Sequence, residues 1–104
     1  MANSSIDYNE LNKFNKTDQE WWDPNGEFKT LHIINPVRID YIQSLVHDHF
    51  TQKKQDLSVL DIGCGGGLIS APMSRLGFNV TALDPNSHNI EACENYTKKT
   101  RVEY

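Results

Sequence analysis

Apolar residues recur at three-to-four spacing in the first half of the chain, which predicts an amphipathic helix from residue 36 to about 53. The recurring pairs are Val37–Arg38, Tyr41–Ile42, Leu45–Val46 and His49–Phe50. Asn35 and Pro36 are typical of a helix start, because the Asn side chain can cap the helix and Pro fits its first position. A shorter helix is expected within 8–20, where Leu11 and Phe14 are three residues apart.

The second half of the chain alternates short apolar runs with helical patterns. The run 57–62 predicts a strand buried on both faces of a parallel sheet. A helix over 68–76 is expected to end at Gly77, and a second strand occupies 78–83. Asn86 or Ser87 can cap a third helix that runs to about residue 97, and 101–104 begins a third strand. The order β-α-β-α-β predicts the N-terminal part of a Rossmann-like α/β fold with a mostly parallel sheet and right-handed crossovers.

Residues 21–28 lie within the helical arm and contain a turn signal. Asp-Pro-Asn-Gly at 23–26 predicts a turn, since Pro presets φ and Asn-Gly tolerates positive φ. Trp21 and Trp22 precede the turn. They either pack the arm onto the body or form a lid over a substrate, and packing is the favoured interpretation. We predict an N-terminal arm and cap at 1–56, and the first part of the Rossmann-like domain at 57–104.

Composition narrows the possible functions. With 104 residues the chain holds one domain at most, and its net charge of −4 argues against a general nucleic-acid-binding surface. No apolar run reaches the roughly 20 residues of a membrane-spanning helix, and the polar N-terminus lacks the layout of a signal peptide. Cys64 and Cys93 form no metal-binding spacing with the four histidines, so no metal site is predicted. This cysteine usage suits a reducing cytosol.

Four glycines fall within the five positions that follow the first predicted strand, at 63–67. A strand, a glycine-rich turn and a helix N-terminus together direct backbone N–H groups toward a bound ligand. The dinucleotide fingerprint G-x-G-x-x-G fails, because Leu68 stands where its third glycine should be. No Gly-Lys-Ser/Thr follows either, so a phosphate-binding P-loop is excluded.

Asp61, two residues before the first glycine, makes this segment resemble the S-adenosylmethionine site of class I methyltransferases. A carboxylate suits a ligand that carries an ammonium and a sulfonium, whereas a pyrophosphate site would disfavour it. Gly63 and Gly65 would let the methionine tail and the ribose lie against the backbone. Asp84 follows the next predicted strand, where an acid can accept hydrogen bonds from both ribose hydroxyls.

The arm "WWDPNGEFKTLHIINPVRIDYI" followed by "VLDIGCGGGLIS" resembles the ubiquinone-biosynthesis O-methyltransferases, the 3-demethylubiquinol 3-O-methyltransferase and 2-polyprenyl-6-hydroxyphenol methylase family. The resemblance runs from about Leu11 to Tyr104. It implies methyl transfer from S-adenosylmethionine to ring hydroxyls of polyprenylated phenols and catechols. It also implies a cytoplasmic protein with peripheral membrane contact at the inner face of the membrane, a ubiquinone-biosynthesis complex as partner, and no nucleic acid.

The resemblance assigns cofactor contacts to Arg38, Gly63 and Asp84, and implies that Arg38 holds the cofactor carboxylate in a charge-assisted pair. Asp61 and Gly65 complete the predicted cofactor-binding residues. Ile33 departs from the basic residue that the family usually has after the histidine. No general base can be assigned; His32 is a candidate for which a structural role is favoured. Cys64 is interpreted as a small packed residue and not as a nucleophile.

Members of that family are more than twice as long, so the chain is expected to be an N-terminal portion whose own catalysis is doubtful. Two other hypotheses stay open at this point. The first is a non-catalytic fragment that binds the cofactor weakly or serves as an interaction partner. The second is a class I methyltransferase for another small molecule. An NAD-linked oxidoreductase is disfavoured by Leu68 and Asp61.

Overall fold

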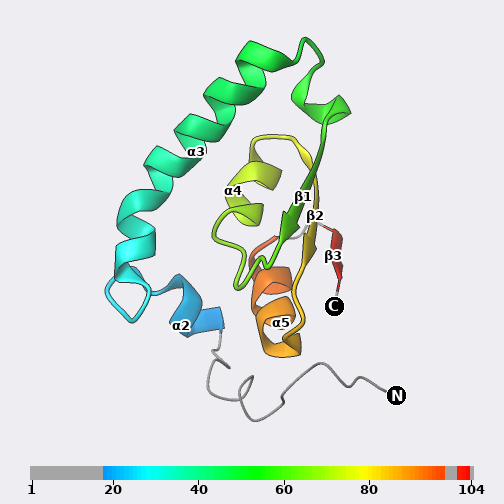
Figure 1. The fold of residues 1–104 in the computed structure, drawn as a ribbon. Helices are drawn as coiled ribbons and strands as arrows, with labels where there is room; N and C mark the ends of the chain where they lie inside the picture. The colour runs from blue at the N-terminus through cyan, green and yellow to red at the C-terminus, as the bar shows by residue number, and fades with distance from the viewer. Residues whose placement is uncertain (1–17, 98–100, 104) are drawn as a thin grey trace.

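A computed structural model of the chain describes residues 18–97 and 101–103 (Figure 1). Its elements, in chain order, are α2 (Asp18–Trp22), α3 (Lys29–His49), the 3-10 turn η1 (Lys54–Asp56), β1 (Ser58–Ile62), α4 (Ser70–Arg75), β2 (Asn79–Leu83), α5 (Ser87–Tyr96) and β3 (Arg101–Glu103). The three strands are parallel in the order β1-β2-β3. The predicted Rossmann-like start is therefore confirmed. Most of the helix expected within 8–20 lies outside the described residues.

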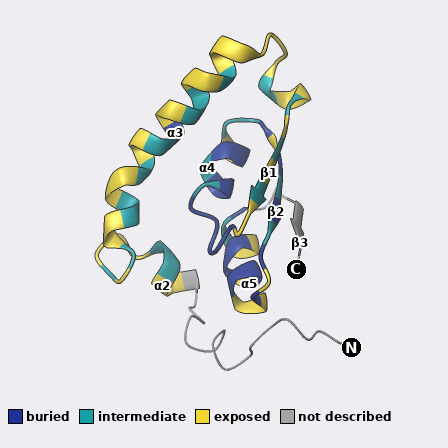
Figure 2. Ribbon diagram, in the orientation of Figure 1, coloured by how far each residue is buried: buried dark blue, intermediate teal, exposed yellow. Residues whose placement is uncertain are grey.

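The helices pack against one face of the sheet. Ile39 of α3, Met73 of α4, and Phe78 and Val80 at β2 form one buried cluster. Ala82, two residues further along β2, joins a second cluster with Cys64 and with Ile90 and Cys93 of α5. Side chains two apart on a strand share a face, so both clusters lie on the same side of the sheet. Figure 2 shows this burial concentrated in α4, α5 and the loop between β1 and α4.

The opposite face of β1 is open, and the prediction of a strand buried on both faces is wrong. Val59 and Asp61 are half-buried, but Leu60 is 57% exposed and Ile62 is 76% exposed. Ile62 pairs with Leu83 of β2. The apolar run was correctly predicted as a strand. Its second face is exposed because all helices among residues 18–97 pack on the other side.

Helix α3 begins at Lys29 and not at Asn35–Pro36, so the predicted start is wrong, and it ends at His49 rather than near Lys53. Pro36 lies inside the helix, where it cannot donate to the carbonyl of His32. Asn35 caps no helix; its Nδ2 donates to the carbonyl oxygen of Leu68, 2.7 Å away, and so ties α3 to the loop before α4.

Each apolar pair predicted on α3 contributes one inward side chain at most. Ile39 is buried, and Ile42 and Val46 pack against the same cluster. Leu31 is half-buried. Five other apolar side chains of the helix are exposed, namely Ile33, Ile34, Val37, Tyr41 and Leu45. The helix therefore has apolar residues on both sides and packs through one of them.

The remaining helix ends follow the sequence signals. Asn86 is the N-cap of α5, and its Oδ1 accepts hydrogen bonds from the backbone N–H groups of His88 at 2.8 Å and Asn89 at 3.4 Å. Gly77 follows α4 with φ of +108°, a conformation that favours glycine. Helix α4 itself is shorter than predicted, because residues 68 and 69 belong to the loop before it.

The two faces of α3 predict different mutational costs. Ile39→Ala should lower the free energy of unfolding by about 2 to 5 kcal/mol, because it leaves a cavity in the core. Val37→Ala, on the exposed face, should change it by no more than about 0.5 kcal/mol. Urea unfolding of the 104-residue chain, followed by circular dichroism, measures both. Equal costs would contradict the orientation of the helix.

Candidate functional site

A cavity of about 430 Å³ lies where β1 and β2 end. It is lined by Trp21, Glu27, Phe28, Gly63, Gly65, Asp84 and Asn89. Gly63 directly follows β1, and Asp84 directly follows β2. The carboxyl ends of parallel strands are where open α/β sheets bind ligands. Two of the five predicted cofactor residues lie outside this lining, namely Arg38 and Asp61.

Different neighbours explain why glycine occupies each of these positions in the loop. A Cβ on Gly65 or Gly66 would lie 2.6 Å or 2.3 Å from ring atoms of Trp21, so these two glycines make room for the arm. A Cβ on Gly67 would lie 2.8 Å from Sγ of Cys93. Gly63 has φ of +73° and nothing within 4 Å of its Cβ position. Gly63 is therefore the loop glycine whose backbone faces open space.

Asp84 holds the loop in place through its buried carboxylate. The backbone N–H of Gly65 donates to Oδ2 at 2.9 Å. Oδ1 accepts from the backbone N–H of Asn86 at 2.9 Å and from Nδ2 of Asn89 at 3.3 Å. Two backbone hydrogen bonds add to this tie, because the N–H groups of residues 63 and 64 donate to the carbonyl oxygen of Leu83 at 2.8 Å and 2.9 Å. The loop after β1 is thus fixed to the end of β2.

Asp61 points toward α4 rather than into the cavity. Its Oδ2 accepts a hydrogen bond from Oγ of Ser70, the first residue of α4, at 2.6 Å. Asp61 lies on the strand face that packs on the helices, which explains this direction. In this structure the carboxylate joins β1 to α4.

Arg38 approaches the loop from α3. Its Nη2 donates to Oδ1 of Asn35 at 2.6 Å, and Asn35 in turn binds the carbonyl oxygen of Leu68. Nε of Arg38 is buried and has no hydrogen-bond partner among the described residues. A buried donor without a partner costs free energy that an acceptor on a bound ligand would recover.

The paired tryptophans pack the arm onto the loop, which is the interpretation that the sequence favoured, and Trp21 also lines the cavity. The Trp21 ring stacks on Phe28 at 4.1 Å with a 3° interplanar angle. Trp22 stacks on Tyr96 of α5 at 4.6 Å, and its Nε1 donates to the carbonyl oxygen of Gly66 at 2.9 Å. Nε2 of His32 hydrogen-bonds with the carbonyl oxygen of Trp21 at 2.9 Å, a structural role as favoured.

Cys64 and Cys93 are buried together beside the loop. A hydrogen bond to Cys93, with burial, raises the pKa of the Cys64 thiol far above its ordinary value, so this thiol stays protonated. A protonated thiol is a poor nucleophile. The interpretation of Cys64 as a packed residue agrees with this environment.

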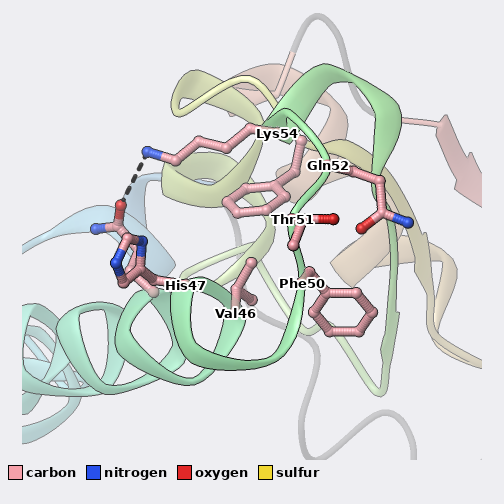
Figure 3. Close-up of a pocket in the computed structure, with 8 residues that line it drawn as sticks. Val46, His47, Phe50, Thr51, Gln52 and Lys54 are labelled. Carbon is pink, nitrogen blue, oxygen red and sulfur yellow. Dashed lines mark hydrogen bonds between the residues drawn. The ribbon is translucent and has the colours of Figure 1, made fainter.

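A second hollow of about 410 Å³ lies at the other end of the sheet, between the end of α3 and η1 (Figure 3). Nζ of Lys54 donates to Oε1 of Gln43 at its rim, 3.2 Å away. Phe78, just before β2, lines it. It lies at the amino ends of the strands and is lined by none of the predicted site residues.

Within the described ranges no group of three or more metal-binding side chains occurs. None of the described helices is long and apolar enough to cross a membrane.

Comparison with known proteins decides the family. A sequence profile described as a methyltransferase domain matches residues 37–103, from α3 through β3. The chain belongs to this methyltransferase family. The matched segment includes the glycine loop, Arg38 and Asp84, and so contains all five predicted cofactor residues.

Relatives of this chain carry a more specific name. The ubiquinone biosynthesis O-methyltransferase of Rickettsia akari (strain Hartford) is 48% identical over 99 residues, which cover 95% of this chain and 39% of that protein. The protein of the same name from Pelagibacter ubique (strain HTCC1062) is 45% identical over 104 residues, covering 95% of this chain and 43% of that protein. The chain spans about two fifths of the length of these curated relatives.

Solved structures show the same fold. The magnesium protoporphyrin IX methyltransferase of Synechocystis PCC 6803, with bound SAM, matches with a TM-score of 0.66 at 21% identity; the match covers 97% of this chain and 55% of that one. A TehB-like SAM-dependent methyltransferase from Corynebacterium glutamicum matches with a TM-score of 0.58 at 18% identity over 92% of this chain and 45% of that one. The chain thus has the N-terminal portion of the class I methyltransferase fold.

Contact between Trp21 and Gly66 predicts an energetic coupling. Gly66→Ala should destabilise the chain by about 1 to 3 kcal/mol, because the new methyl group overlaps the indole. In a Trp21→Ala background the same change should cost much less, since the obstructing ring is gone. A double-mutant cycle on the free energy of unfolding measures the difference. Additive costs would show that the ring does not lie on the loop.

Proposed function

We propose that this chain forms the S-adenosylmethionine-binding part of an O-methyltransferase of ubiquinone biosynthesis, which methylates ring hydroxyls of polyprenylated phenols or catechols. The observation that carries the proposal is the cavity at the ends of β1 and β2, where Gly63 exposes bare backbone beside Asp84. The names of the relatives at 45% and 48% identity supply the pathway and the reaction.

The donor set fits this cofactor. Asp84 can accept a hydrogen bond from a ribose hydroxyl, and the open backbone at Gly63 leaves room for the ligand to lie against the chain. Arg38 lies outside the cavity lining, but its buried Nε, which has no partner among the described residues, suits the carboxylate at the far end of the cofactor. Bound there, S-adenosylmethionine supplies an electrophilic methyl group on a sulfonium. The chain's own contribution is to bind and orient the cofactor, and positioning of this kind supplies a large part of a rate enhancement.

Asp61 has a different role in this proposal from the one the sequence alone gave it. Its carboxylate is bonded to Ser70 and lies outside the cavity lining. We assign it to the joint between β1 and α4, with its charge acting on a bound ammonium at longer range. Gly65 serves the ligand through its backbone, because its Cβ side is covered by Trp21.

The substrate side of the proposal follows from chemistry. A polyprenyl tail is strongly apolar, so the enzyme must meet its substrate at a lipid surface, and a peripheral membrane contact at the inner face with partners in the pathway is part of the proposal. Cytoplasmic placement fits the two free cysteines. His32 is not assigned as general base, because it is bonded to the Trp21 carbonyl and does not line the cavity.

Two ligands and two variants test the cofactor assignment. Arg38→Met should weaken S-adenosylhomocysteine about tenfold or more, as expected for loss of a hydrogen bond between charged groups. The same variant should bind 5′-methylthioadenosine, which lacks the amino-acid portion, as well as the wild type does. Asp84→Asn should weaken both ligands, because both contain the ribose. Calorimetric titration of the protein at its full encoded length measures the dissociation constants of both ligands for the wild type and for each variant.

Asp56→Asn on η1, remote from the cavity, is the control and should leave both affinities unchanged. Wild-type protein that binds NADH in place of S-adenosylhomocysteine would overturn the proposal in favour of an oxidoreductase. Equal losses for both ligands in Arg38→Met would overturn the carboxylate assignment alone.

A further inference from the structure

A chain of side-chain hydrogen bonds links the N-terminal arm to Asp84. Nε1 of Trp21 donates to Oδ1 of Asn89 at 3.1 Å. Nδ2 of the same Asn89 side chain donates to Oδ1 of Asp84 at 3.3 Å. Trp21 and Asn89 are 68 residues apart in the sequence, and both line the cavity. Asp84, the proposed ribose-binding acid, is therefore bonded to Asn89, which is in turn bonded to Trp21 of the arm.

The two partners of Asn89 fix the orientation of its amide. An indole nitrogen is a donor only, so it can bond to Oδ1 and not to Nδ2. An ionised carboxylate is an acceptor only, so it requires the NH₂ end. One of the two flip states of the amide satisfies both neighbours, and the other places like groups against each other. The indole of Trp21 thus directs the NH₂ group of Asn89 at Asp84.

This arrangement leaves the two oxygens of Asp84 unequal. A carboxylate offers about four acceptor positions, two on each oxygen. Among the described residues, Oδ1 accepts two hydrogen bonds, from Asn86 and Asn89, whereas Oδ2 accepts one, from Gly65. By this count, one acceptor position on Oδ2 has no donor among the described residues. The simple expectation that the acid accepts from both ribose hydroxyls alike does not fit this count.

We propose that Asn89 is a positioning residue of the ribose subsite, and that Trp21 sets its orientation so that Asp84 offers one fixed acceptor position, on Oδ2, to a single ribose hydroxyl. The inference rests on the proposed function. It makes the arm a part of the cofactor site: when Trp21 is docked, Asn89 occupies Oδ1 and the ribose is recognised through one hydroxyl. Without that indole donor the amide is free to rotate, and Oδ1 becomes available to the second hydroxyl.

The test compares S-adenosylhomocysteine with its 2′-deoxy and 3′-deoxy analogues on the protein at its full encoded length. In the wild type, removal of one hydroxyl should weaken binding about tenfold or more, as for a hydrogen bond to a charged acceptor, and removal of the other by less than about threefold. In Asn89→Ala and in Trp21→Phe, which keeps an aromatic ring, the two analogues should bind within about threefold of each other. The ratio between analogues cancels any general loss of affinity from weaker folding.

Trp22→Phe is the matched control. It removes an indole donor from the same arm, but that donor binds the carbonyl oxygen of Gly66 and not Asn89. It should weaken all three ligands alike and keep the wild-type ratio. A wild-type ratio near one, or an unchanged ratio in Trp21→Phe and Asn89→Ala, would overturn this inference while leaving the proposed function intact. A wild-type protein that binds no S-adenosylhomocysteine would overturn both.

Discussion

The buried carboxylate of Asp84 must be satisfied by N–H donors, and the geometry of the site follows from how this is done. A charge removed from water is costly unless it is hydrogen-bonded, so each of its donors is held firmly. One donor is the backbone of Gly65, which fixes the loop after β1 to the end of β2. A second is the backbone N–H of Asn86, in the turn after β2, and a third is the side-chain amide of Asn89. This acid therefore joins the loop after β1, the turn after β2 and the first turn of α5 at one point beside the cavity.

The glycine loop makes room both for neighbouring side chains and for a ligand, and the sequence does not show which glycine serves which purpose. Gly65 and Gly66 leave room for Trp21, and Gly67 for Cys93. Gly63 alone among the four faces open space. Most of this bare backbone serves packing within the protein, and one position serves access. Glycine-rich ligand loops are usually explained by the ligand, but in this chain the close approach of the indole accounts for as much of the pattern.

The parts of the fold that could be predicted from the sequence depend on local chemistry. The strand-helix alternation, the Asn86 cap and the glycine after α4 all express preferences of a few neighbouring residues. The start of α3 was wrong because Asn35 finds its partner in Leu68, far along the chain, and so caps nothing. Exposure of Ile62 could not be predicted either, since an apolar strand carries no record of what covers each face. Asn89 could not be predicted as a site residue, because Asn is common in the first turn of a helix. Its role depends on its contacts with Trp21 and Asp84, which the sequence does not show.

The arm contacts the loop and α5 through hydrogen bonds as well as through apolar packing, and the hydrogen bonds fix its position. Apolar packing tolerates small sliding movements, because its energy depends on buried area and not on angle. The two indole N–H groups instead demand acceptors in fixed directions, one on Asn89 and one on the carbonyl of Gly66. Each ring is held at one such point, Trp21 on α5 and Trp22 on the loop, so neither can shift without breaking its hydrogen bond. The two rings thus fix the position of the arm, although the described residues of the arm contribute no strand to the sheet.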